Sequence, residues 1–226
     1  MAEKTAPIEL YEAMSSLRAV RRLKPDPIPD EVLHRVLEAA TWAPTGGNAQ
    51  PWRVVCVRDR AKMAALGELY AQGWHAYAES HMKLIADAPV AVRTATEKMF
   101  DAGNYLADHF AETPALLVFC FNPKNMAITD ARLDRISVVG GASIYTAVQN
   151  TLLACRAEEL GCVLTTLLCA DEESVRRLLD IPLPWGTAAA IPTGYPVLRG
   201  HGPITRRPVE KMAYADSWNT PLTLNP

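Results

Sequence analysis

The order of apolar and polar positions predicts alternating helices and strands. Apolar residues recur at helical spacing over residues 10–17 and from about Asp30 to Thr41, where Asp30 and Glu31 suit a helix N-terminus. Short apolar runs between turn residues predict strands at 53–57, 115–121, 163–169 and 187–195. The expected order is helix, helix, strand, helices, strand, helix, strand, short helix, strand.

A further helical pattern covers Val138 to Leu160. Its apolar side chains spread around most of the circumference, and no charged residue occurs before Arg156. Such a helix is expected to be buried nearly all round. A single domain could bury it as its own central helix, or a second subunit could cover part of it.

Composition indicates one globular domain. The chain has 226 residues, of which 49% are hydrophobic and 21% charged, so it can bury a sizeable core. The formal net charge of -2 argues against a general nucleic-acid or anionic-membrane binder. The mixed polar N-terminus does not have the pattern of a secretory signal, and the longest apolar stretch contains glycines and amides, so we expect no membrane span.

The spacing of the cysteines and histidines argues against disulfide and metal sites. The five cysteines form no CxxC pair, and their odd number does not suggest a disulfide framework, so a reducing cytoplasm is the expected location. The five histidines show neither HxH nor HExxH spacing, and we expect no metal site. Neither a GxSxG elbow nor a GxxxxGK[ST] phosphate loop is present.

The segment Ala43 to Trp52, APTGGNAQPW, has the composition of a ligand loop. Gly46 and Gly47 lack a Cβ, so the backbone can take positive φ and approach a flat ligand. Thr45 and Asn48 offer a hydroxyl and an amide beside them. The alternative is a plain helix stop followed by a strand start.

Three arginines stand close together upstream of that loop. On a helix or its last turn, Arg18, Arg21 and Arg22 would project from one face and converge on a single anion. The alternative is a solvated basic face at a helix C-terminus, where cations also favour the helix dipole.

Together these two segments resemble the FMN-dependent nitroreductase superfamily, whose motifs have the forms RRSxRxF and APSGxNxQPW. Arg18 and Arg21 fall on the second and third basic positions of the first motif, whereas Leu17 and Ala19 replace its first Arg and its Ser. ITRRP near the C-terminus is similar to the family's phosphate-closing motif. The resemblance implies cofactor contacts at Arg18, Ala19, Arg21, Arg22, Thr45, Gly46, Gly47, Asn48, Thr165, Thr166, Leu167, Arg206 and Arg207.

The same resemblance implies the architecture. It predicts one α+β domain over residues 1–226, with a mixed, mainly antiparallel sheet surrounded by helices. In this family the central helices pack across a homodimer, and each flavin site is completed by both subunits. Residues 208–226 are expected to form a C-terminal extension that wraps the partner subunit.

The resemblance also implies the chemistry. The expected enzyme holds FMN, takes hydride from NADH or NADPH by a ping-pong mechanism, and reduces a nitroaromatic, quinone or enone. No catalytic side chain is assigned, because the chemistry belongs to flavin N5. The alternatives are a noncatalytic flavin-binding or flavin-storage protein, or a relative specialised in dehalogenation, flavin fragmentation or deazaflavin use.

Residues 67–104 are the predicted substrate-lid excursion. The segment carries aromatic side chains on a predicted helix, with Tyr70, Trp74 and Tyr77 as candidate lid residues. The alternative is an ordinary surface helix whose aromatic side chains pack inward.

Overall fold

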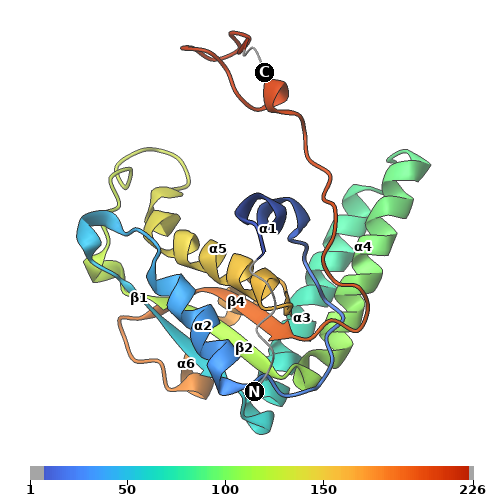
Figure 1. The fold of residues 1–226 in the computed structure, drawn as a ribbon, viewed down its shortest axis with the longest axis vertical. Coiled ribbons are helices and arrows are strands. Elements are labelled where there is room, and N and C mark those ends of the chain that lie inside the picture. Colours follow the sequence, from blue (N-terminus) through green and yellow to red (C-terminus); the bar gives the residue numbers. More distant parts are fainter. Residues whose placement is uncertain (1–7, 224–226) are drawn as a thin grey trace.

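A computed structural model describes residues 8–223 (Figure 1). The helices of this part are α1 (Leu10–Ser16), α2 (Asp30–Thr41), α3 (Arg60–Leu84), α4 (Val90–His109), α5 (Ala142–Ala157) and α6 (Glu172–Leu179). The strands are β1 (Trp52–Val57), β2 (Ala115–Phe121), β3 (Gly161–Cys162) and β4 (Gly186–Gly194). The predicted order of elements is confirmed.

The four strands form one sheet in the order β1-β2-β4-β3. All three strand pairs are antiparallel, with Val118 of β2 opposite Val55 of β1 and Ala190 of β4. The expected α+β fold with a mainly antiparallel sheet is therefore confirmed.

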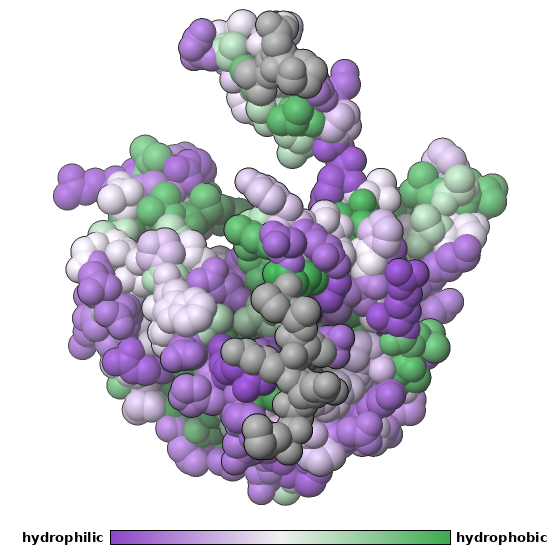
Figure 2. Space-filling model, in the orientation of Figure 1, coloured by the Kyte–Doolittle hydropathy of each residue, from purple (hydrophilic) through white to green (hydrophobic). Residues whose placement is uncertain are grey.

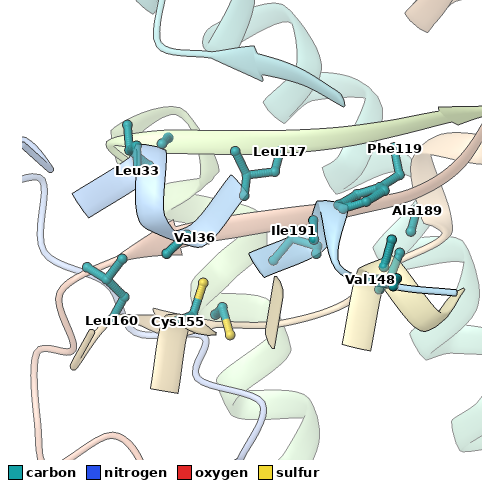
Figure 3. Close-up of a cluster of buried hydrophobic side chains, with 14 of the residues drawn as sticks. Leu33, Val36, Leu117, Phe119, Val148, Cys155, Leu160, Ala189 and Ile191 are labelled. Carbon is teal, nitrogen blue, oxygen red and sulfur yellow. The ribbon is translucent and has the colours of Figure 1, made fainter. Parts of the chain in front are cut away.

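Both faces of the sheet are covered by helices. Alternate side chains of β2 point to opposite faces, so each face contributes apolar side chains that pack against helices. Leu117 and Phe119 pack against α2 and α5 in the core cluster drawn in Figure 3. Leu116 and Val118 join a second cluster with side chains from α3, α4 and α6. Strand β2 is consequently apolar throughout, and β4 is apolar apart from the buried Thr187 and Thr193.

The arginine segment is extended, which corrects the helical-face prediction. Helix α1 ends at Ser16, and the following chain pairs with distant backbone. The Val20 N–H donates to the Cys162 carbonyl at 2.9 Å, and the Lys24 N–H donates to the Tyr195 carbonyl at 2.7 Å. These long-range hydrogen bonds draw residues 18–24 out of helical geometry, so the arginines do not share a helical face.

The third predicted strand is also corrected. Only Gly161–Cys162 pairs regularly with β4, ahead of the predicted 163–169. Thr165 forms a single bridge with Ala190, and Leu167–Asp171 then turns into a 3-10 helix. The Asp171 carboxylate accepts from the Ser174 N–H and caps α6, so the chain must turn there.

The central helix is shorter and less enclosed than its sequence predicts. Val139–Gly141 is a 3-10 turn, and α5 begins at Ala142. Within the chain, α5 buries Ala147, Val148 and Cys155 but leaves Tyr145 and Gln149 exposed. All-round burial is therefore wrong for one chain, because α5 has one face exposed at Tyr145 and Gln149.

Helices α3 and α4 form a long hairpin, which contains the predicted lid excursion 67–104 (Figure 1). The segment after β4 leaves the body of the domain, and residues 208–223 stand clear of it with exposed apolar side chains (Figures 1 and 2). Residues 1–7 of the predicted domain and 224–226 of the predicted extension lie outside the described residues. No helix in the described range is long and apolar enough to cross a membrane.

Candidate functional site

Arg18 is fixed beside a polar cavity. Its guanidinium donates through Nε and Nη2 to the Pro203 carbonyl, at 2.9 and 2.5 Å. The cavity next to this segment, residues 199–206, has a volume of about 810 Å³. Its charged lining residues are Glu12, Arg156, Glu159, Arg199 and Arg206.

These charges favour an anion at the cavity. Arg156 lies 3.5 Å from the Glu12 carboxylate, so part of its charge is neutralised. Arg206 is exposed, and its Nη1 donates to the neighbouring Thr205 carbonyl at 2.8 Å. With Arg199, the lining carries more cations than carboxylates, and guanidinium groups match a phosphate in geometry as well as charge.

The other two arginines of the segment point elsewhere. The Arg22 guanidinium lies 4.2 Å from the ring centroid of Tyr105 on α4, which is a cation–π contact. Arg21 is half-buried, and its charge acts on Tyr70 of α3. The predicted convergence of Arg18, Arg21 and Arg22 on one anion is therefore wrong, because an extended chain spreads the three side chains apart.

Arg21 and Thr165 both lie near Tyr70, in the middle of α3. Burial raises the pKa of the Tyr70 phenol above its ordinary value, while the charge of Arg21 and a hydrogen bond with Thr165 act in the opposite direction. Thr165 is buried, Thr166 is exposed, and a Cβ built on Gly73 of α3 would meet Leu167 at 3.5 Å. The positive side chain of Arg21 is thus brought close to the segment 165–167.

The Thr45 to Asn48 loop has the geometry its composition predicts. Gly46–Asn48 is a 3-10 turn between α2 and β1, with φ of 58° at Gly47 and 54° at Asn48. The Gly46 N–H donates to the Ser143 hydroxyl at 3.0 Å, and the Gln50 N–H donates to the Thr45 hydroxyl at 3.1 Å. A Cβ built on Gly47 would meet nothing within 4 Å, so this backbone faces open space.

The loop and the arginine end are not brought together within one chain. Ser143, which holds the loop, is in the first turn of α5. Arg18 is tied to the other end, where His201 contacts the Leu160 carbonyl. Helix α5 has 16 residues between them and is therefore about 24 Å long.

The lid candidates differ in exposure. Tyr70 is 2% exposed and stacks on Phe110, and Trp74 is 5% exposed with its indole N–H on the Asn104 amide oxygen at 2.7 Å. Tyr77 is 45% exposed. Tyr70 and Trp74 are therefore packed inward, as the alternative interpretation expects, and Tyr77 is the candidate with an open surface.

Several site residues carry no signal in the sequence. Ser143 supports the loop from 97 positions away, and His201 contacts Arg18 across 183. Arg156 and Arg199 line the cavity without belonging to any basic motif. Among residues 8–223, no group of three or more His, Cys, Asp or Glu side chains is placed to hold a metal ion.

Comparison with known proteins adds the family. The model of the nitroreductase family matches residues 15–195. An NADH dehydrogenase of Thermus thermophilus is 32% identical over 216 residues, which cover 93% of this chain and 98% of that protein. A 5,6-dimethylbenzimidazole synthase of Rhodobacter capsulatus is 30% identical, over 91% of this chain and 92% of that protein.

The fold agrees with a solved structure that contains a flavin. Iodotyrosine deiodinase bound to FMN and 3-iodo-L-tyrosine matches with a TM-score of 0.65 and 25% identity, over 88% of this chain and 94% of that chain. This agreement in fold is consistent with the family match over residues 15–195 and with the two relatives of 30% or more identity. The chain belongs to the nitroreductase family, whose members are usually flavin-dependent oxidoreductases.

Proposed function

We propose that the protein is an FMN-dependent oxidoreductase that takes hydride from NADH or NADPH and reduces a small nitroaromatic, quinone or enone. The observation that carries the proposal is the spread of cations along the extended segment, with Arg18 at the polar cavity and Arg21 at Tyr70 and Thr165. That arrangement suits a ligand with an anionic group at one end and a ring at the other. Bound FMN would supply the hydride transfer.

The residues fit such a ligand at both ends. Arg206 would hold the phosphate, because it lines a cavity with an excess of positive charge. Arg18 would join it from the neighbouring segment, where its guanidinium contacts the Pro203 carbonyl of the cavity lining. Arg21 would face the ring, where a cation stabilises negative charge on a reduced flavin. Gly46 and Gly47 would bring backbone close to the ring, since neither carries a side chain that blocks approach.

We propose further that a homodimer completes each site. Helix α5 separates the loop of one chain from its own arginines by about 24 Å, and the face of α5 at Tyr145 and Gln149 is open. A second copy packed on this face in the opposite direction would bring its loop to the first copy's arginines. Residues 208–226 would wrap that copy, and the free cysteines suit a reducing cytoplasm.

The first test is the absorbance spectrum of the purified protein, followed by anaerobic titration with NADH and with NADPH. We expect about one FMN per chain, bleaching by the pyridine nucleotide alone, and return of colour with a quinone. Initial rates should give the parallel double-reciprocal lines of a ping-pong mechanism. A protein that stays colourless and binds no added FMN would contradict the proposal.

Four further outcomes separate the alternative chemistries. Iodide release from 3-iodo-L-tyrosine would indicate dehalogenation, and loss of the flavin ring under oxygen would indicate flavin fragmentation. Colour without bleaching by either nucleotide would indicate flavin storage or another electron donor. Preference for an added deazaflavin over FMN would indicate a deazaflavin enzyme.

A further inference from the structure

His201 lies buried between the Arg18 segment and the end of α5. It is 8% exposed, with Nε2 at 2.8 Å from the Leu160 carbonyl oxygen and Nδ1 at 3.3 Å from the Arg18 backbone nitrogen. A carbonyl only accepts hydrogen bonds, and a peptide N–H only donates. The neutral imidazole with its proton on Nε2 is therefore the one form that satisfies both contacts.

This contact joins the two segments that carry the proposed phosphate ligands. The Arg18 side chain donates to the Pro203 carbonyl, and the Gly202 N–H donates to the Ser16 carbonyl at 2.9 Å. Arg206 follows on the same segment as Gly202 and Pro203, and it lines the cavity together with His201. Among these links, the His201 contact is the one that a proton can open.

The surroundings keep the imidazole neutral. Burial lowers the pKa of His201 below its ordinary value of 6.5, the charge of Arg156 lowers it further, and the hydrogen bond to Leu160 opposes them. The ring is therefore neutral near pH 7 and takes up a proton only on acidification. The charged groups facing this region are Glu12 of α1, Arg156 of α5, Glu159, Arg18, and Arg199 and Arg206 of its own segment.

We propose that neutral His201 is a positioning residue for the cofactor phosphate, because it ties the backbone of Arg18 to the segment that carries Arg206. Protonation places a second N–H against the Arg18 N–H, donor facing donor in a buried place, and so releases Arg18. FMN affinity then falls in acid. This inference rests on the proposed flavin function, and it assigns no contact between His201 and the reacting atoms.

Two substitutions separate positioning of Arg18 from general structural support. In His201→Asn the amide oxygen can take the place of Nδ1 and accept from the Arg18 N–H, and it does not titrate. In His201→Gln the longer amide can reach the Leu160 carbonyl in place of Nε2. His34→Asn is the matched control, because His34 is an exposed histidine on α2.

The measurement is the FMN dissociation constant of each apoprotein, by flavin fluorescence, from about pH 8 to about pH 5. The phosphate of FMN titrates near pH about 6 in every variant, so the comparison between variants isolates His201. We expect the wild type and His34→Asn to lose roughly tenfold more affinity in acid than His201→Asn. His201→Gln should bind FMN weakly at every pH.

Urea unfolding of the same apoproteins gives a reading that needs no flavin. A histidine with a lowered pKa binds its proton more readily in the unfolded chain, so the free energy of unfolding falls as pH drops below about 6.5. We expect His201→Asn to lack this component. The contribution of His201 to the free energy of unfolding should be complete above pH about 6.5, and it should be lost as the pH falls through the lowered pKa of His201 in the folded state.

Three outcomes would overturn the proposal. An equal loss of FMN affinity in acid for the wild type and His201→Asn would show that His201 does not control phosphate binding. Normal FMN binding by His201→Gln would show that support of Leu160, not of Arg18, is what matters. A wild type that unfolds with the expected pH dependence but binds no FMN at any pH would reject the flavin function itself, and the phosphate role of His201 with it.

Discussion

At the scale of single residues, one basic motif supplies side chains with different tasks. Arg18 contacts Pro203 beside the cavity, Arg21 acts on Tyr70, and Arg22 stacks on Tyr105. Their separation follows from the extended backbone, in which successive side chains point to different sides. Adjacent basic residues can therefore be tested one at a time.

Arg206 and Arg207 offer a matched pair for such a test. Both are exposed neighbours, but Arg206 lines the cavity and Arg207 is not among its lining residues. The variant Arg206→Ala loses one charge-assisted contact with the phosphate, so it should bind FMN roughly ten- to a hundred-fold more weakly. Fluorescence titration should show little change for Arg207→Ala, and riboflavin, without a phosphate, should be insensitive to both. Equal losses for FMN and riboflavin would exclude the phosphate contact.

The cysteine side chains are expected to be unreactive in the folded protein. Burial, with smaller effects of Glu172 and Cys169, raises the pKa of Cys120 to about 11. At pH about 8, roughly one Cys120 thiol in a thousand is then the reactive thiolate. Iodoacetamide should label Cys120 more slowly than the half-buried Cys169, and mass spectrometry measures both rates. Rapid labelling of Cys120 in native protein would contradict this assignment.

At the scale of elements, the α3–α4 hairpin depends on one close approach. The Trp74 ring of α3 packs against Gly103 of α4, where a Cβ would lie 1.9 Å from a ring carbon. The hydrogen bond of the indole to Asn104 keeps the ring in place. A glycine is therefore required at position 103 for packing, in a helix whose propensity it lowers.

A pair of glycine substitutions tests this packing. Gly103→Ala should lower the free energy of unfolding by about 2 kcal/mol, because overpacking exceeds the gain in helix propensity. Gly73→Ala on α3 should be neutral or stabilising by about 0.5 kcal/mol, since its Cβ meets Leu167 at an ordinary 3.5 Å. Urea titrations measure both. Equal stability of the two variants would mean that Trp74 can move aside.

At the scale of the whole molecule, exposed apolar side chains gather on parts that leave the body. Figure 2 shows them on the tail and at the end of the α3–α4 hairpin, where Leu84 and Val90 are exposed. Trp218 on the tail is 82% exposed and contacts Tyr214 of the same tail. Apolar surface of this kind marks an interaction site, in agreement with the proposed homodimer.

The dimer proposal is tested on the open face of α5. In a two-fold interface, Gln149→Glu would place like charges on both copies of the same surface, so the dimer should weaken at micromolar concentration. Gln72→Glu on the exposed side of α3 is the control with the same change of charge. Analytical ultracentrifugation should show a dimer for wild type and Gln72→Glu. A wild-type monomer that retains FMN would refute the shared site.

The sequence by itself determined the features that depend on short-range chemistry. Helix Asp30–Thr41 follows from its apolar spacing, and the turn with positive φ at Gly47 follows from its glycines. The apolar runs at 53–57, 115–121 and 187–195 coincide with β1, β2 and β4. The runs of β2 and β4 are continuous because these central strands are buried on both faces. The family resemblance could be recognised for the same reason, because its motifs are short and local in the sequence.

Tertiary structure alone decided what depends on partners far along the chain. The Arg18 segment is extended because Val20 and Lys24 donate to carbonyls more than a hundred positions away, which no local period reveals. The strand expected at 163–169 is reduced to a single bridge at Thr165, because the chain then turns into the 3-10 helix Leu167–Asp171 ahead of α6. His201 became visible only when folding placed it between Arg18 and Leu160, because a histidine acquires a role from its neighbours in space, not in sequence.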